Sequence, residues 1–160
     1  MEHPPGRVVQ DFAARTMANY RYVRKGTFYP SRDVYDVTQA INSLLGLVVI
    51  PMQAHSHVFE NVPLSVLPTE KWPEALRNIE TPFARLGDLM RALRNAIAHA
   101  EFAFASSNNE ISSVTFSGTH RGSNWRMALS VEELEQLIFA LGGALSFAPD
   151  ATNSFNRRVG

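Results

Sequence analysis

The sequence predicts a mainly α-helical protein with a β-hairpin inserted before the C-terminal helix. Apolar residues recur at helical spacings of three and four in two long segments, residues 34–48 and 86–97. Residues 110–129 instead alternate apolar and polar side chains on either side of a turn-like segment. Ser130 followed by Glu133 then forms the capping-box pattern that marks the start of a last helix.

Length and composition indicate a single domain and exclude several classes of protein. The chain has 160 residues, 45% of them hydrophobic, which predicts one domain over residues 1–160 with its core at about 7–146 and a C-terminal tail at 147–160. The absence of cysteine excludes disulfides and thiolate zinc sites. A net charge of +0 means that any nucleic-acid site must be local. Without a secretory signal or a membrane-length apolar run, we expect a cytoplasmic protein that does not enter a membrane.

The first predicted helix, residues 7–25, is the most basic part of the chain. Residues 1–32 carry six basic residues against two acidic ones, a net charge of +4. This charge suits a phosphate backbone, although a solvated face balanced by acids elsewhere is what such runs more often represent. Gly26 is a natural stop. The expected buried residues are Val8, Val9, Phe12, Met17, Tyr20 and Val23.

The second predicted helix starts after Ser31, a good N-cap, and ends at Pro51. Residues 44–50 within it are apolar nearly all round, so we expect this part to be deeply buried. Tyr35, Gln39 and Asn42 lie on another face, where they either support a polar site or meet solvent.

Prolines punctuate the next segment, residues 53–82, which we expect to be irregular. A short helix over residues 71–79 is possible because Pro73 would lie in its first turn. His55 and His57, with Glu60 close by, resemble metal ligands, but no further ligand set accompanies them. We therefore expect no metal site and no cofactor.

The central predicted helix begins near Thr81-Pro82 and runs to about Phe102. Its apolar face should pack on the second helix and consists of Leu86, Leu89, Met90, Leu93 and Ile97. The roughly opposite face is polar and consists of Asp88, Arg91, Asn95 and His99, with Arg94 between the two. Small residues lie beside this polar face, so we expect that another helix can approach it: Ala92, Ala96 and Ala98.

The hairpin and last helix complete the expected fold. We predict strands over residues 110–117 and 124–129, joined by a turn over 118–123. The last helix should run from Val131 to about Leu145, burying residues that include Leu134, Leu137, Ile138 and Leu141.

The end of the central helix is the segment with a chemical mechanism. Phosphate-binding loops, zinc-protease motifs and serine-hydrolase elbows are missing from the sequence. Metal-free RNA cleavage needs a base for the 2′-OH, and histidine suits this role, so His99 is the candidate. Arg94 could stabilise the charge of the transition state, and Asn95, one turn before His99, could orient the imidazole or hold a phosphate oxygen. Spacing alone equally allows Arg94 to form a structural ion pair and His99 to favour a helix C-terminus as a cation.

The segment Arg94-Asn95-Ala96-Ile97-Ala98-His99 resembles the Arg-x4–6-His signature of the HEPN superfamily, in which a polar residue commonly follows the arginine. Residues 15–19, residues 35–46 and the hairpin before the last helix resemble a plasmid- and bacterium-borne HEPN family, so that the similarity spans most of residues 7–146. This resemblance implies a helical bundle that usually dimerises and brings two motifs together.

Many HEPN domains are metal-independent endoribonucleases that act as toxins or in anti-phage defence, whereas others are non-catalytic. The resemblance therefore implies two alternatives for this chain. One is a homodimeric endoribonuclease with Arg94, Asn95 and His99 as catalytic residues, RNA as substrate and a possible antitoxin partner. The other is an interaction module that binds a nucleotide, RNA or a partner protein.

Overall fold

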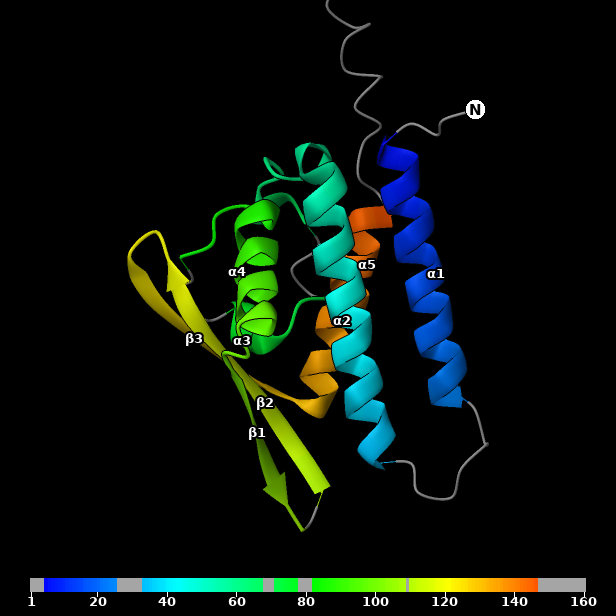
Figure 1. Cartoon of the computed structure of the whole chain (residues 1–160), viewed down its shortest axis with the longest axis vertical. Helices are drawn as coiled ribbons and strands as arrows, with labels where there is room; N and C mark the ends of the chain where they lie inside the picture. Colours follow the sequence, from blue (N-terminus) through cyan, green and yellow to red (C-terminus); the bar gives the residue numbers. More distant parts are fainter. Residues whose placement is uncertain (1–4, 26–32, 68–70, 78–81, 109, 147–160) are drawn as a thin grey trace, which may run out of the picture.

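The computed structural model describes residues 5–25, 33–67, 71–77, 82–108 and 110–146. Five α-helices, two 3-10 turns and three strands follow one another within these ranges (Figure 1). The elements are α1 (Pro5–Lys25), α2 (Asp33–His55), η1 (Ser56–Val58), η2 (Leu64–Val66), α3 (Glu74–Arg77), α4 (Leu86–Ala98), β1 (Phe102–Ser107), β2 (Glu110–His120), β3 (Ser123–Ser130) and α5 (Val131–Ser146). The protein is mainly α-helical, as predicted, and its antiparallel sheet lies in the chain between α4 and α5.

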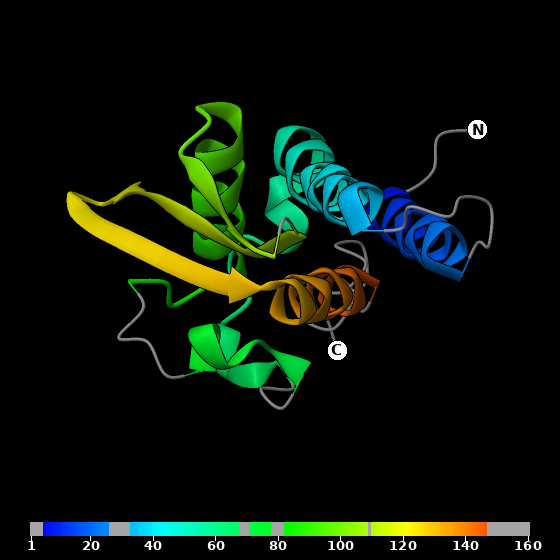
Figure 2. The ribbon, with the colours of Figure 1, turned by 90° about the horizontal axis from the view of Figure 1, so that it is seen from below.

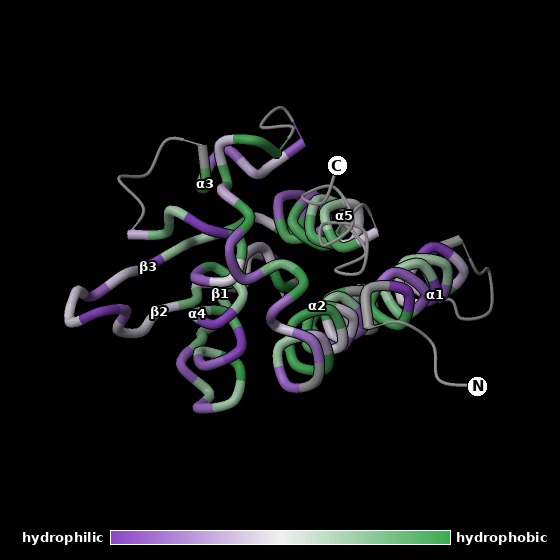
Figure 3. The backbone as a smooth tube through the Cα atoms, turned by 90° about the horizontal axis from the view of Figure 1, so that it is seen from above, coloured by the Kyte–Doolittle hydropathy of each residue, from purple (hydrophilic) through white to green (hydrophobic). Residues whose placement is uncertain are grey.

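The helices and the sheet enclose one hydrophobic core. Helix α1 packs against α2 and α5, while α4 packs against α2 on one side and β2 on the other. Viewed from below, the curved sheet passes under α4 and leads directly into α5 (Figure 2). Hydrophilic and hydrophobic segments alternate along the long helices, which is the pattern of amphipathic helices with one buried face (Figure 3). None of the helices in the described ranges is long and apolar enough to cross a membrane.

The buried face of α1 differs in part from the expected one. Val9 and Tyr20 are buried as predicted, but Val8 and Val23 are exposed, and Ala13 occupies the core instead. Ala13 lies four residues after Val9 and therefore on the same face of the helix. It was not among the residues expected to be buried, because only large apolar side chains were counted. The predicted stop, Gly26, lies outside the described residues.

The prediction that the second helix ends at Pro51 is wrong. Helix α2 continues through Pro51 to His55. Proline removes one backbone donor and crowds the preceding turn, which usually breaks a helix. Here Pro51 is buried, so packing of the surrounding turn offsets the lost hydrogen bond. The predicted N-cap, Ser31, lies outside the described residues.

The central helix begins later than predicted, at Leu86 instead of Pro82. The preceding segment is extended, with Arg85 at φ −128° and ψ 153°, and its backbone forms a bridge to Pro63. The N–H of Leu86 donates to the carbonyl of Val62 at 2.8 Å, and the N–H of Leu64 donates to Ala84 at 3.0 Å. This pairing satisfies the backbone groups that a longer helix would have used. Thr81, the other half of the predicted start, lies outside the described residues.

The same helix ends at Ala98, and the predicted continuation to Phe102 is also wrong. Ala100 has the left-handed value φ 55°. The N–H of Glu101 donates to Ala96 at 2.7 Å, and the N–H of Ala100 donates to Ile97 at 3.2 Å. These two bonds define a Schellman C-cap, which usually has glycine where this chain has Ala100. The helix therefore ends without a glycine, the residue from which its end could have been predicted in the sequence.

The sheet has three strands in the order β1-β2-β3, not the two of the predicted hairpin. The additional strand, β1, pairs antiparallel with β2 so that Phe102 lies opposite Phe116. Strands β2 and β3 are longer than predicted, because their turn needs only Arg121 (φ 50°) and Gly122 (φ 81°). Two central residues with positive φ are typical of a tight type I′ hairpin.

The start of the last helix is as the sequence predicts. The Ser130 hydroxyl accepts from the N–H of Glu133 at 3.1 Å, while the Glu133 carboxylate accepts from the N–H of Ser130 at 3.0 Å. This reciprocal capping box converts the last residue of β3 directly into the N-cap of α5. Leu134, Leu137, Ile138 and Leu141 are all buried, as predicted.

Candidate active site

The residues of the polar face of α4 differ in burial and in their contacts. At its N-terminal end, Asp88 is buried and not exposed as expected from the helical spacing. Its Oδ1 accepts from Arg121 Nη2 at 3.1 Å and lies 3.5 Å from His120 Nε2. His120 is the last residue of β2, and Arg121 follows it in the β2–β3 turn. Asp88 therefore holds the tip of the hairpin against α4 and does not belong to the candidate site.

Arg91, one turn further, forms an exposed ion pair. Its Nη2 lies 2.9 Å from Glu60 Oε1, and both side chains are almost half exposed. Glu60 is thus directed to α4 and not to the histidines at the end of α2. Such an exposed pair adds little stability. The remaining polar residues of the candidate site, Arg94, Asn95 and His99, lie in the C-terminal half of α4 and at its end.

Arg94 and Asn95 contact each other directly. Arg94 Nη1 donates to Asn95 Oδ1 at 2.8 Å, and both residues are half-buried. The amide oxygen thereby restricts the guanidinium, whose other donors can still meet an anion. Asn95 contacts the arginine, whereas from the sequence alone it was assigned to orienting the histidine or holding a phosphate oxygen.

His99 is the C-cap residue of α4 and has an exposed side chain. Its backbone N–H donates to the carbonyl of Asn95 at 2.9 Å, one turn earlier. The Schellman bonds of Ala100 and Glu101 fix the chain immediately after it. Within the described ranges, no hydrogen bond involves the imidazole. The backbone of His99 is therefore held rigidly while its imidazole is open to a proton donor or acceptor.

Two of the three small residues of α4 do not lie on the surface where the sequence placed them. Ala92 and Ala96 are buried in the core of the same chain, so they cannot admit a helix from another subunit. Ala98 is exposed. The surface that α4 can offer to a partner is consequently narrower than predicted and is centred on Ala98 and His99.

A shallow pocket of about 600 Å³ opens one residue beyond His99. It is bounded by residues 100–105 of the C-cap and β1, together with Thr115, Ser117 and Arg126. Arg126 adds a cation near the end of α4 that the sequence reasoning missed. Arg126 shares this pocket with β1, a strand that was not predicted from the sequence. The alternation of Phe102 and Phe104 with small residues was the signal for that strand.

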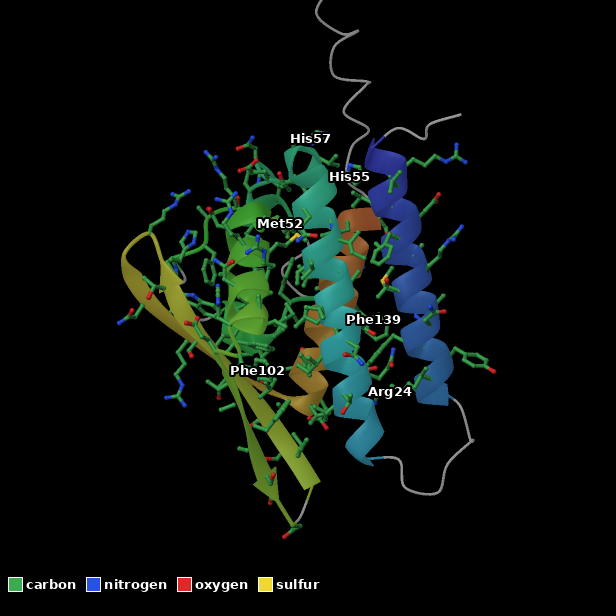
Figure 4. The ribbon with its side chains drawn as sticks, viewed as in Figure 1. Arg24, Met52, His55, His57, Phe102 and Phe139 are labelled. Carbon is green, nitrogen blue, oxygen red and sulfur yellow. The ribbon has the colours of Figure 1, made fainter. Side chains whose placement is uncertain are left out.

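The histidines of the α2 end do not form part of this site. His55 and His57 lie at the upper end of α2, whereas Phe102, three residues after His99, lies much lower in the molecule (Figure 4). The ring centroids of His55 and His57 are 6.4 Å apart. Among the described side chains, no group of three or more histidine and carboxylate residues could hold a metal ion.

Comparison with known proteins defines the class to which this fold belongs. A family model described as HEPN pEK499 p136 matches residues 1–150, and the mainly α-helical fold with its inserted sheet is that of a HEPN domain. The chain belongs to this plasmid-derived HEPN family. No curated protein and no solved structure matches it.

Proposed function

We propose that this protein is a metal-independent endoribonuclease whose site is the C-terminal end of α4. The observation that carries the proposal is that Arg94 donates to Asn95 at 2.8 Å and that Asn95 lies one turn before an exposed His99 at the end of α4. It occurs in a chain of the HEPN class, whose domains are often ribonucleases. Metal-free phosphodiester cleavage needs a cation to stabilise the transition state and groups that transfer protons, and the end of α4 supplies one arginine and one exposed imidazole per chain.

In the proposed reaction, His99 takes the proton of the ribose 2′-OH while the 2′-oxygen attacks the adjacent phosphorus. The P–O5′ bond breaks, a 2′,3′-cyclic phosphate forms, and the 5′-oxygen leaves with a proton from an imidazolium. Arg94 stabilises the negative charge on the non-bridging oxygens through its charged donors. Asn95 keeps the guanidinium in place by accepting from it, and its NH2 group can donate to the same phosphate.

The reaction needs both a base and an acid, and one chain offers a single His99 at this surface. We therefore include a homodimer in the proposal, in which two copies of Ala98 and His99 meet and each imidazole takes one of the two roles. Ala98 is small and exposed, which permits close approach at that point. Such an enzyme would act as a toxin or in anti-phage defence, restrained by an antitoxin protein.

A non-catalytic binding module is the second candidate function. Arg94 is turned towards Asn95, and no hydrogen bond in the described part of the chain joins either residue to the His99 imidazole. With the shallow pocket beyond His99, the same residues would then bind a nucleotide, RNA or a protein without cleaving it.

The chemistry of the products separates the two functions. Wild-type protein is incubated with mixed RNA in EDTA, and with DNA of the same sequence. The ribonuclease proposal predicts RNA fragments that end in 2′,3′-cyclic phosphate and intact DNA, since DNA lacks the attacking 2′-OH. RNA that is bound but remains intact would favour the binding module, and cleavage of both polymers would contradict the proposed mechanism.

A further inference from the structure

A second pocket, of about 680 Å³, lies between α1 and α5, on a part of the molecule that shares no residue with α4. The segment around η2 and Trp72 closes its third side. This volume is within the range of about 300–1,000 Å³ that is typical of sites for small molecules. We refer to it as the α1–α5 pocket. Phe139, which lines it, points between α5 and α1, away from Phe102 at the other site (Figure 4).

The surface of the α1–α5 pocket is mainly apolar. Trp72 and Ala140 are buried residues that line it, and Phe139 is half-buried. Val66, at 68% exposure, is the most exposed of the large apolar residues in the described ranges and stands at the rim. An apolar side chain left in water next to a hollow of this size indicates a surface suited to an apolar ligand.

The charged residues that line the pocket in the described part of the chain have one sign. They are Arg21 and Lys71, and none of the described lining residues is acidic. The Arg21 guanidinium lies 5.0 Å from the centre of the Phe139 ring, which fixes it over the apolar surface. Arg24, the next arginine on α1, is instead ion-paired with Glu135 of α5. Among the described residues, neither Arg21 nor Lys71 takes part in an ion pair, so the pocket favours an anion.

Two adjacent glycines in α5 explain why there is room for a ligand. A Cβ atom on Gly142 would lie 2.2 Å from the sulfur of Met17, so a side chain at this position would displace the Met17 side chain where α5 packs on α1. A Cβ atom on Gly143 would meet nothing within 4 Å. Gly143 lines the pocket, and the space beside it is therefore open.

We propose that the α1–α5 pocket binds a small organic anion with an apolar body, such as a medium-chain carboxylate. The apolar part contacts Trp72, Phe139 and Ala140, and the anionic group lies between Arg21 and Lys71. A single compact molecule fits the volume, whereas a peptide helix would need a long groove. The proposal is independent of the ribonuclease activity, because it uses no residue of α4.

Titration with octanoate, followed by calorimetry and by the change in tryptophan emission, to which Trp72 in the pocket and Trp125 outside it both contribute, tests this proposal. Octan-1-ol serves as the neutral ligand of the same chain. We expect octanoate to bind at least roughly tenfold more tightly than the alcohol, which corresponds to one charge-assisted contact. Lys71→Gln and Arg21→Gln should each abolish most of that preference and leave the alcohol unaffected. Arg15→Gln, an exposed cation on α1 that does not line the pocket, should change neither.

Filling the pocket gives a second, independent test. Gly143→Leu should remove binding of both ligands while the helical circular dichroism is retained. If this variant does not fold, the result rests on Lys71→Gln and Arg21→Gln, which change side chains that are exposed. Equal affinity for octanoate and octan-1-ol, or an octanoate preference that survives both charge substitutions, would overturn the proposal. So would binding to anionic lipid vesicles without any binding of free octanoate.

Discussion

Arg94 and Asn95, neighbours in the sequence, are joined by a side-chain hydrogen bond of 2.8 Å at the half-buried end of α4. Adjacent helical residues point about 100° apart, so such a bond forms only when a long side chain folds back. The guanidinium is consequently held beside the helix and does not extend freely into water. His99 follows one turn later, at a C-cap fixed by Ala100 and Glu101.

This bond predicts the effect of removing the amide. Asn95→Ala should lower the rate of RNA cleavage by roughly tenfold, because Arg94 then loses the group that restrains it. The loss should be smaller than that caused by Arg94→Ala, which removes the charge itself. Cleavage rates and melting temperatures of the two variants measure this. The double variant Arg94→Ala/Asn95→Ala should lose no more than Arg94→Ala alone, and additive losses would show that Asn95 also acts independently of Arg94.

The C-cap predicts an unusual response to glycine. Ala100 has φ 55°, a conformation that costs a non-glycine residue about 1–2 kcal/mol, so Ala100→Gly should raise the free energy of unfolding by about 0.5–1 kcal/mol after the entropic cost of glycine. Ala98→Gly, two residues earlier and helical, should lower it by about 1 kcal/mol. Urea unfolding of both variants provides the comparison. The idea fails if both substitutions destabilise the protein to a similar extent.

The first turn of α4 predicts the opposite behaviour at Gly87. A Cβ atom there would lie 2.7 Å from the Cα and the carbonyl oxygen of Glu60, which are backbone atoms. Gly87→Ala should therefore destabilise the protein by about 1–3 kcal/mol, since overpacking exceeds the gain in helix propensity. Gly143→Ala in α5 is the matched control, and with open space around it the substitution should be stabilising by about 1 kcal/mol. Thermal denaturation that ranks the two variants in reverse would contradict this packing.

The buried carboxylate of Asp88 predicts unequal effects of two arginine substitutions. Arg121→Ala removes a hydrogen-bond donor from the buried Asp88 carboxylate and leaves His120, at 3.5 Å, as its remaining partner among the described residues. Because the Arg121 side chain is largely exposed, the cost should be about 1 kcal/mol of stability. Arg91→Ala breaks an exposed ion pair with Glu60 and should cost at most about 0.5 kcal/mol. Chemical denaturation measures both. A cost for Arg121→Ala as small as that for Arg91→Ala would mean that the hairpin tip is not held by this pair.

Local signals were sufficient to predict some elements and insufficient for others. The capping box at Ser130 and Glu133 needs only residues three positions apart, and it forms as expected. The bounds of α4 depend instead on distant partners. Its start is set by pairing with residues 62–64, and its end by an alanine in a conformation that usually requires glycine. Without that stop, Phe102 continued the helical pattern, and β1 was missed.

The candidate site was predicted in the same partial way. The spacing of Arg94, Asn95 and His99 placed them at one helix end, where the structure has them. It could not show that Asp88 is buried, because His120 at the end of β2 and Arg121 in the following turn come more than thirty residues later in the chain. Nor could it show that Ala92 and Ala96 face the core of their own chain. Helical spacing tells which residues share a face, but the neighbouring elements decide what that face meets.

The central claim is that His99 carries the proton transfer in RNA cleavage, and one comparison tests it most directly. Wild-type protein, His99→Ala and His57→Ala are incubated with the same RNA in EDTA, and initial cleavage rates are measured for each folded variant. His57 is the control because it lies at the far end of α2 (Figure 4). We predict that His99→Ala loses at least about a hundredfold in rate, the usual scale of general acid–base catalysis, while His57→Ala cleaves as fast as wild type. Cleavage by His99→Ala at the wild-type rate would contradict the assignment.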